Sequence, residues 1–226
     1  MTKMVKKVKL LEGQLPVLSV ACDTIPAAYE RCIKYLWDYG VDYRSLNDKK
    51  NDNGAYIYPP SRMATMTVTI AWPFKKPMVH RDLKDFNSTQ ENLPLLIDED
   101  AKKVASKLSP GVRSRHFDQS VYYKSAFGQL LVDDKNELVF NFNVQRTNID
   151  IGWFWARGVL LGATIQKRVA EILTEKIGDC LVKPGRYSEY YSLLRIPGNI
   201  IDNAFLKRFN EMLLEPISNR VLDKKE

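Results

Sequence analysis

Two strongly alternating segments between positions 125 and 145 limit the fold of this chain more than any other feature. The first, SAFGQLLV, and the second, ELVFNFNVQ, are separated by DDKN, whose Asp and Asn residues are typical of β-turns. On the second segment apolar residues would face one side and amides the other: Leu138, Phe140, Phe142 and Val144 against Asn141, Asn143 and Gln145. The pattern predicts a β-hairpin with one buried face.

A long helix should follow this hairpin. From about Trp155 to Lys176 apolar residues recur on more than one side: Val159, Leu160, Leu161, Ile165, Val169, Ile172 and Leu173. This spacing predicts a central helix. An earlier helix is expected to run to about Tyr39, with Asp23 or Thr24 as N-cap, Pro26 in its first turn and Gly40 as its stop.

The remaining segments complete an α+β pattern. RMATMTVTIAW predicts a strand with Met66, Val68, Ile70 and Trp72 on its buried side, and DEDAKKVASKL predicts a helix. A strand near residues 180–182, a Pro-Gly turn, the strand RYSEYYSLLRI and the helix NAFLKRFNEMLL should follow. Hairpins, a central helix and later strands predict an α+β fold with a mostly antiparallel or mixed sheet.

Length and composition favour one domain over residues 1–226, with residues 1–14 and 218–226 as flexible termini. No run of about 18 apolar residues occurs, and the apolar start is too short for a secretory signal, so we expect a cytoplasmic protein with no membrane partner. Cys22, Cys32 and Cys180 have no CxxC spacing, and only His80 and His116 accompany them. We therefore expect reduced thiols and no metal site.

The net charge is +7, from 34 basic and 27 acidic residues, and it favours anionic partners. Lysines gather near both ends, at Lys3, Lys6, Lys7, Lys9, Lys224 and Lys225. Terminal solvation explains these lysines at least as well as nucleic-acid binding does, so nucleic acid stays an alternative partner.

The second hairpin strand ends in polar residues that bear on function. Asn141, Asn143 and Gln145 share one face, and buried amides cost free energy unless they are hydrogen-bonded, so this face should meet water or a polar ligand. Arg146 follows directly. An arginine there is either a ligand anchor or a solvated or ion-paired strand end, and Tyr190 is either a ligand contact or packed against Tyr187 and Tyr191.

The segment from the hairpin to the late strand resembles the core of the thymidylate synthase and pyrimidine-nucleotide hydroxymethylase family. In that family a strand ends in Gln-Arg-Ser, an Asp follows, then a long helix, a Gly-Asp pair and a His-x-Tyr. The matching residues are, in order, Gln145, Arg146, Thr147, Asp150, Gly178, Asp179 and Tyr190. The resemblance covers most of the chain through short motifs, and it implies the family's α+β fold and a homodimer joined through its sheet.

The resemblance also implies roles for these residues. Arg146 would grip the phosphate of a pyrimidine nucleoside monophosphate, with Thr147 beside it, because a guanidinium matches phosphate with a planar set of donors. Tyr190 would reach the sugar hydroxyl, Asp150 would lie near the base, and Gln145 would line the pocket. Arg113 or Arg115 would add phosphate contacts across the dimer interface.

The chain departs from the family at the residues that carry the chemistry. The nucleophilic cysteine, which attacks carbon 6 of the pyrimidine, is replaced by Lys124. The His of His-x-Tyr is Ser188, and the Asn that reads the base is Gly158, next to Arg157. The C-terminal SNRVLDKKE lacks the apolar closing tail, which puts a folate cofactor in doubt.

Three hypotheses follow. Lys124 acts as an alternative nucleophile or base, helped by a lowered pKa beside other cations. Alternatively, the chain is a related transferase of nucleotide metabolism or base hypermodification that reads another nucleotide with Arg157, Trp153 and Trp155. In the third, it is a catalytically silent nucleotide- or nucleic-acid-binding homologue. The aromatic residues at the start of the long helix are also typical of core packing.

Overall fold

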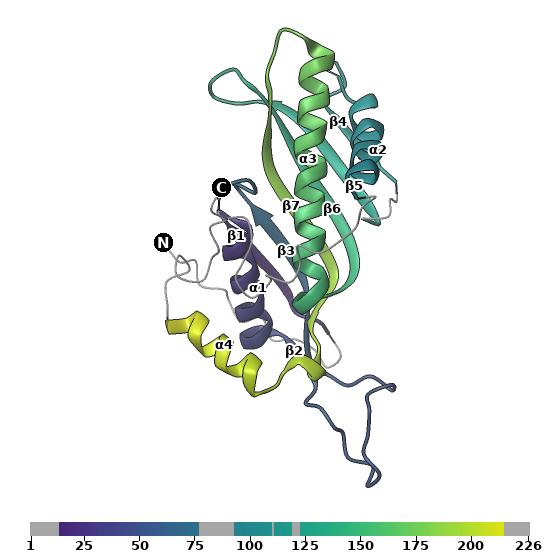
Figure 1. The fold of residues 1–226 in the computed structure, drawn as a ribbon, viewed down its shortest axis with the longest axis vertical. Helices are drawn as coiled ribbons and strands as arrows, with labels where there is room; N and C mark the ends of the chain where they lie inside the picture. The colour runs from purple at the N-terminus through teal and green to yellow at the C-terminus, as the bar shows by residue number, and fades with distance from the viewer. Residues whose placement is uncertain (1–13, 77–92, 110, 119–122, 215–226) are drawn as a thin grey trace.

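The computed structural model describes residues 14–76, 93–109, 111–118 and 123–214 (Figure 1). In these residues seven strands form one sheet in the order β1-β3-β7-β6-β5-β4, and β2 also pairs with β3. Their bounds are Val17–Cys22 (β1), Val41–Tyr43 (β2), Ser61–Ile70 (β3), Ser114–Phe117 (β4), Ser125–Val132 (β5), Leu138–Asp150 (β6) and Val182–Ile196 (β7). The pairs β1/β3 and β6/β7 are parallel and the others antiparallel. The predicted α+β class with a mixed sheet is confirmed.

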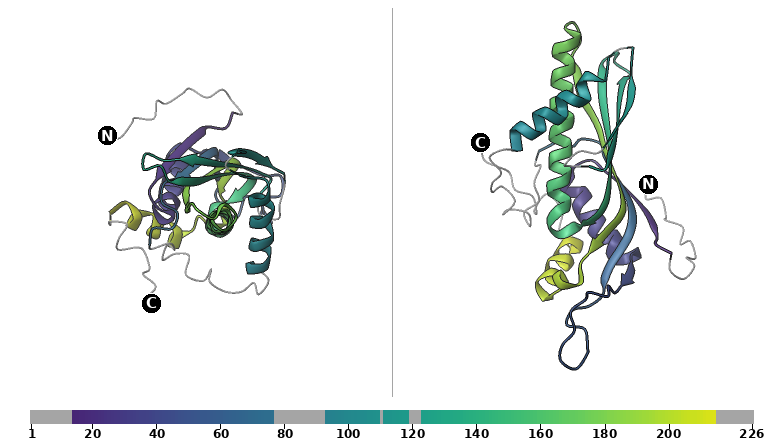
Figure 2. Two further views of the ribbon diagram at one scale, coloured as in Figure 1. Left: turned by 90° about the horizontal axis from the view of Figure 1, so that it is seen from above. Right: turned by 90° about the vertical axis from the view of Figure 1, so that its right-hand side faces the viewer.

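The helices lie on one side of this sheet (Figure 2). They are α1 (Ile25–Tyr39), α2 (Leu93–Ser106), α3 (Ala156–Ile177) and α4 (Asn203–Leu214). Helix α3 is the predicted central helix: it packs on β6 and β7, with α2 against it, while α1 packs on β1 and β3. None of the described helices combines the length and the apolar character needed to span a bilayer.

The start and end of α1 follow from its sequence. The Thr24 hydroxyl accepts a hydrogen bond from the backbone N–H of Ala27 at 3.3 Å, as expected for an N-cap, and Pro26 occupies the first turn. Gly40 ends the helix. The buried face, which includes Tyr29, Cys32 and Leu36, then covers β1 and β3.

The predicted Pro-Gly turn after residue 182 is wrong. Pro184 and Gly185 lie inside β7, where the pairing with β6 shifts register between Phe140 and Phe142. The buried side-chain amide of Gln166 on α3 donates to the carbonyl oxygens of Phe140, Gly185 and Arg186 at 2.9–3.1 Å. A helix side chain therefore satisfies the carbonyls of this irregularity, and one strand of 15 residues replaces the two that were predicted.

The prediction that Trp72 lies on the buried side of its strand is also wrong. Strand β3 ends at Ile70, and the side chain of Trp72 is 63% exposed. Its backbone N–H donates to the carbonyl oxygen of Asp23 at 2.8 Å, outside the ladder of β3. The alternation stops because the chain turns away after Ile70. The predicted flexible termini lie outside the described residues, apart from Gln14.

Candidate functional site

Arg146 is buried, with 8% of its surface exposed, on the side of the sheet that the helices cover. Its Nε donates to Glu189 Oε1 at 3.0 Å, and its Nη2 donates to the carbonyl oxygen of Gly158 at 2.7 Å. Of the two interpretations of this arginine, the structure shows the ion pair. Its role as a phosphate anchor stays a prediction, and a ligand would have to compete with Glu189 for the guanidinium.

Glu189 and Tyr187 complete a buried polar cluster with Arg146, which we call the Arg146 cluster. The Tyr187 hydroxyl donates to Glu189 Oε1, and both residues are at most 1% exposed. Burial raises the pKa of Glu189 above its ordinary range, although Arg146 acts in the opposite direction. Burial lowers the pKa of the Arg146 guanidinium, but Glu189 and Tyr187 outweigh this effect and the net shift is upward.

Two glycines on α3 make room for this cluster. A Cβ at Gly158 would lie 3.1 Å from Arg146 Cζ, and a Cβ at Gly162 would lie 2.6 Å from Tyr187 Cζ and closer still to its hydroxyl oxygen. Positions i and i+4 share one face of a helix, so the two glycines form a continuous notch against β6 and β7. Gly158, noted above as a missing base reader, therefore has a packing role here.

Gln145, Thr147 and Tyr190 lie on the other side of the sheet from Arg146. Gln145 and Tyr190 are register partners on neighbouring strands, and Ser125 Oγ donates to Gln145 Oε1 at 2.8 Å. Gln145 therefore does not line one pocket with Arg146, as the resemblance implied, because successive side chains of a strand point to opposite faces. We call this side of the sheet, which none of the described helices covers, the open face.

Asp150, the predicted acidic residue of the site, is held by Arg195 on the neighbouring strand. Arg195 Nε contacts Asp150 Oδ1, and Nη2 donates to Oδ2 at 3.2 Å. The hydrogen bond to Asp150 raises the pKa of Arg195. This bidentate pair is about one third exposed on the arginine side, and it fixes the guanidinium at the end of β6 and β7.

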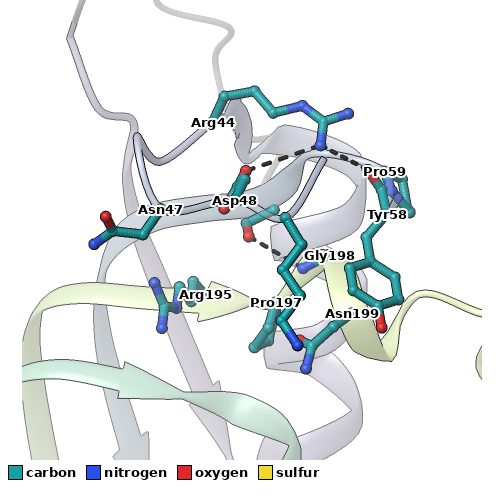
Figure 3. Close-up of a pocket in the computed structure, with 11 residues that line it drawn as sticks. Arg44, Asn47, Asp48, Tyr58, Pro59, Arg195, Pro197, Gly198 and Asn199 are labelled. Atoms are coloured by element: carbon teal, nitrogen blue, oxygen red, sulfur yellow. Dashed lines mark hydrogen bonds and ion pairs between the residues drawn. The ribbon is translucent and has the colours of Figure 1, made fainter. Parts of the chain in front are cut away.

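A polar pocket of about 240 Å³ opens beside Arg195 (Figure 3). One wall comes from the segment after β2 and the other from the end of β7 and the residues that follow it. The lining residues are Arg44, Asn47, Asp48, Lys49, Tyr58, Pro59, Ser61, Arg195, Pro197, Gly198 and Asn199. Three of them are cations and one, Asp48, is an anion. We call this cavity the polar pocket.

Internal contacts hold both walls of the polar pocket. Arg44 Nη1 donates to the carbonyl oxygen of Tyr58 at 2.6 Å and lies 3.8 Å from Asp48 Oδ2. The backbone N–H of Gly198 donates to Ser61 Oγ at 3.1 Å, which ties the end of β7 to the start of β3. These contacts fix the backbone that carries the cations.

Comparisons with known proteins identify no family. No family model matches the sequence, and no curated protein matches it. Among solved structures, the fold is similar to thermostable thymidylate synthase A from Bacillus subtilis, with a TM-score of 0.47, 9% identity and 85% of each chain covered. At this level of similarity no functional residue can be transferred.

The other predicted site residues are not brought to one place. Lys124 is exposed just before β5, and its backbone N–H donates to the Gln145 carbonyl oxygen at 2.9 Å. Arg115 is exposed on the edge strand β4, opposite Gly128, and Arg113 is exposed just before it. Strands β5 and β6 separate β4 from β7, which carries Arg195, and the predicted contacts of Arg113 and Arg115 across a dimer stay predictions.

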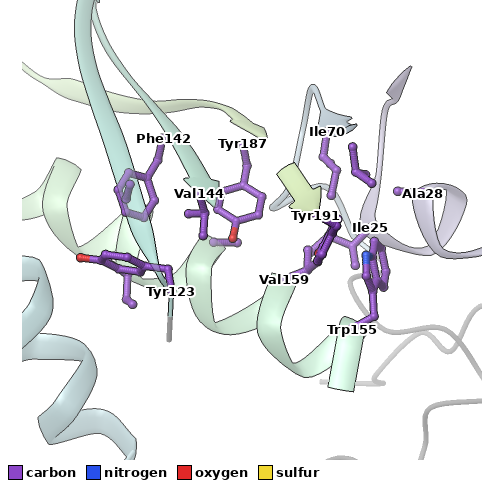
Figure 4. Close-up of a cluster of buried hydrophobic side chains, with 14 of the residues drawn as sticks. Ile25, Ala28, Ile70, Tyr123, Phe142, Val144, Trp155, Val159, Tyr187 and Tyr191 are labelled. Atoms are coloured by element: carbon purple, nitrogen blue, oxygen red, sulfur yellow. The ribbon is translucent and has the colours of Figure 1, made fainter. Parts of the chain in front are cut away.

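Trp155 belongs to the core. It is fully buried at the end of a π-helical turn, Ile151–Trp155, its ring centroid lies 5.9 Å from that of Tyr29, and Figure 4 shows it beside Tyr191 and Ile25. Base stacking on Trp155 would need this packing to open. Arg157, two residues later, is half-buried at the start of α3.

None of the three cysteines lies on the β5–β6 hairpin, where the resemblance implies a nucleophile. Cys22 and Cys32 are buried on the helix side, where burial raises the pKa of both thiols, and Cys180 is exposed between α3 and β7. Among the described residues no group of three or more His, Cys, Asp or Glu side chains could hold a metal ion.

Sequence reasoning missed Arg195, Arg44, Lys49 and Glu189. Arg195 had a visible signal: it lies near the end of the apolar run YYSLLRI, much as Arg146 follows the alternating run LVFNFNVQ. The prediction that the strand ends at Arg146 is wrong, because β6 continues to Asp150. Arg44 and Lys49 lie in a polar stretch that the sequence marks only as a loop, and their relation to Arg195 appears only in the folded chain.

Proposed function

We propose that this chain binds a pyrimidine nucleoside monophosphate, with the phosphate in the polar pocket. The supporting observation is the convergence of Arg44, Lys49 and Arg195 on one cavity, since phosphate is recognised by clustered cations with fixed donor geometry. The choice of a pyrimidine base and of a monophosphate rests on the resemblance to the thymidylate synthase family. In this proposal the phosphate binds Arg195 and not Arg146, because Arg146 pairs with Glu189.

Asp150 has a positioning role in this proposal. Its carboxylate accepts hydrogen bonds from Nε and Nη2 of Arg195, so Nη1 is the nitrogen that can donate to a phosphate oxygen. A carboxylate in this place orients the guanidinium and also reduces the local positive charge, as Asp48 does beside Arg44. Lys49 is then the cation of the pocket that pairs with no carboxylate among the described residues, and it supplies the charge that balances the phosphate. At about 240 Å³ the pocket takes the phosphate and sugar, and the base extends toward Tyr58 and Asn199.

Removing the guanidinium of Arg195 should abolish nucleotide binding. We expect dUMP or dCMP to raise the melting temperature of the wild type and to leave that of Arg195→Ala unchanged, because a ligand stabilises only the state that binds it. Lys49→Ala should weaken binding by about tenfold, as a loss of about 1.4 kcal/mol implies. Thermal shift and calorimetric titration measure both effects.

The matched control is Lys34→Ala, which removes the same charge from the outer surface of α1, where Lys34 pairs with Asp38 at 3.0 Å. It should bind nucleotide like the wild type. Each variant is compared with its own ligand-free melting temperature, so a small loss of stability in Arg195→Ala does not affect the result. Equal nucleotide shifts in Arg195→Ala and the wild type would refute the proposed site.

Nucleotide binding is the proposed function, and catalysis is not part of it. The transferase activity implied by the resemblance would need a nucleophile at the start of β5, where Lys124 is exposed and where none of the three cysteines lies. A role for Lys124, and the use of folate, stay predictions that rest on the resemblance. The form of the proposal that the geometry favours is a catalytically silent nucleotide-binding protein.

We also propose that the chain forms a homodimer through the open face. Two central rows cross the sheet without a charged side chain: Thr67, Tyr190, Gln145 and Ser125, then Thr69, Ser188, Asn143 and Phe127. Depletion of charge is typical of the centre of a protein interface. Amides and hydroxyls can both donate and accept, so such a face is complementary to a copy of itself.

A positive charge in the middle of this face should prevent the association. Tyr190 is 40% exposed there, and Tyr190→Arg would bring two guanidinium groups together across a twofold axis. We expect a dimer for the wild type and a monomer for Tyr190→Arg in sedimentation velocity. Thr164→Arg, on the exposed side of α3, is the control and should stay dimeric; a monomeric wild type would exclude the interface.

A further inference from the structure

A second cavity lies at the other end of β3 from the polar pocket. It has a volume of about 440 Å³ and is lined by Ala71, Trp72, Pro73, Phe74, Lys75, Lys183 and Pro184. Ser61, the first residue of β3, lines the polar pocket, whereas Ala71 follows Ile70, the last. A strand of ten residues spans roughly 33 Å, so the two cavities are separate sites. We call the second one the Trp72 pocket.

The indole of Trp72 is exposed on a fixed backbone. The backbone N–H of Trp72 donates to the Asp23 carbonyl oxygen at 2.8 Å, and its backbone carbonyl oxygen accepts from the N–H of Lys75 at 3.1 Å. The backbone N–H of Ala71 donates to the Cys22 carbonyl oxygen at 2.9 Å. The turn is therefore tied to the end of β1. A tryptophan that is 63% exposed on such a turn offers a flat apolar surface that loses little freedom when a ring stacks on it.

The chemistry of the lining is aromatic and cationic. Trp72, Phe74 and two prolines supply apolar walls, and Lys75 and Lys183 supply the polar groups. Lys183 Nζ already donates to Glu137 Oε2 at 2.5 Å, so its charge is balanced. Lys75 is exposed, and none of the described residues that line the pocket is acidic. An apolar cavity of this size with one available cation is typical of a site for a small aromatic anion.

We propose that the Trp72 pocket binds a planar aromatic group that carries an anionic substituent. The ring stacks on the Trp72 indole between the prolines, and the anion pairs with the Lys75 ammonium. A nucleobase with a phosphate and an aromatic carboxylate share this chemistry, and they are the two sources of such a ligand. The proposal is independent of the phosphate site at Arg195.

The probe for the test is 8-anilinonaphthalene-1-sulfonate, which combines fused rings with a fixed negative charge. We expect one saturable site per chain on the wild type at neutral pH. Trp72→Ala should weaken it by about tenfold or more, the range that loss of an aromatic stacking partner gives. Lys75→Gln should weaken binding by a smaller factor and reduce its dependence on salt, because it removes the ionic contact but keeps the stem.

Two controls keep the result specific. Leu46→Ala removes a different, fully exposed apolar side chain outside the pocket and should bind the probe like the wild type. Arg195→Ala should do the same, which separates this site from the proposed nucleotide site. Trp72 is exposed, so its alanine variant should fold, and its melting temperature and circular dichroism verify that.

Competition then distinguishes the two sources of the ligand. Displacement of the probe by AMP, but not by 2-naphthoate, identifies a nucleotide site, and the reverse identifies a site for aromatic acids. Saturable binding that survives Trp72→Ala unchanged would overturn the proposal. The absence of saturable binding of the probe to the wild type would also overturn it.

Discussion

Replacement of Arg146 by methionine is expected to lower the free energy of unfolding by about 3–5 kcal/mol, the cost of leaving a buried carboxylate without its partner. Glu189 is 1% exposed, and Arg146 Nε is its cationic partner at 3.0 Å. Methionine fills a similar volume, so a cavity contributes little to the loss. Chemical denaturation at neutral pH measures it.

The loss should depend on pH in a definite direction. Burial raises the folded-state pKa of Glu189 above its unfolded value, so its contribution to stability is fully present below the unfolded pKa and declines as pH rises through the folded pKa. Arg146→Met removes the group that most lowers the pKa of Glu189, so in the variant the loss of stability continues to a higher pH. The difference between variant and wild type should therefore be smallest at acidic pH and largest at neutral pH.

Two variants control for this interpretation. Arg168→Met removes an arginine whose ion pair with Asp98 lies at the surface of α3, and it should cost far less. Glu189→Gln in the Arg146→Met background removes the unpaired charge and should recover part of the loss, which a double-mutant cycle quantifies. If Arg146→Met is as stable as the wild type, the Arg146 cluster does not hold the fold. The same effect makes Arg146→Ala unsuitable as a test of ligand binding.

The second large effect is expected at the glycine notch. Gly162→Ala should lower the free energy of unfolding by about 2–4 kcal/mol, although Gly to Ala inside a helix ordinarily stabilises by about 1 kcal/mol. The new Cβ would overlap the Tyr187 ring, with Cζ at 2.6 Å, so the ring must move and its hydroxyl must leave Glu189. A buried carboxylate oxygen would then lose a donor.

The glycines of this chain supply a graded control. Gly158→Ala places its Cβ 3.1 Å from Arg146 Cζ and should cost less, and Gly111→Ala has Ser109 Oγ as its nearest neighbour at 3.9 Å and should change little. Denaturation of the three variants should rank them in this order. A Gly162→Ala protein that gains stability, as helix propensity alone predicts, would contradict the packing of Tyr187 against α3.

Local patterns predicted the elements well because their causes are local. Thr24 caps α1 through a contact three residues away. In the turn of the hairpin, the Asp133 carboxylate accepts from the N–H groups of Lys135 and Glu137 at 2.9 Å, and Asn136 adopts a φ of 60°. Residues of this kind favour such turns whatever surrounds them, so composition alone was sufficient.

The site was not predictable in the same way, because its contacts join distant segments. Arg146 and Glu189 are 43 positions apart, and the bond from Gly198 to Ser61 that closes the polar pocket spans 137. An arginine that follows an alternating run does not show from the sequence which side of the sheet it faces or which carboxylate it meets. The resemblance predicted phosphate as the partner of Arg146, whereas in the folded chain its partner is Glu189.

The Arg146 cluster also acts as a check on strand register. In the parallel pair, Val144 lies opposite Glu189 and Arg146 opposite Tyr191. A slip of β6 by one residue would turn Arg146 to the open face and leave Glu189 buried without a cation, at a cost of several kcal/mol. Apolar side chains tolerate small misalignments, whereas a lone buried charge does not. The ion pair can thus exclude misaligned forms of the crossover that joins β6, α3 and β7.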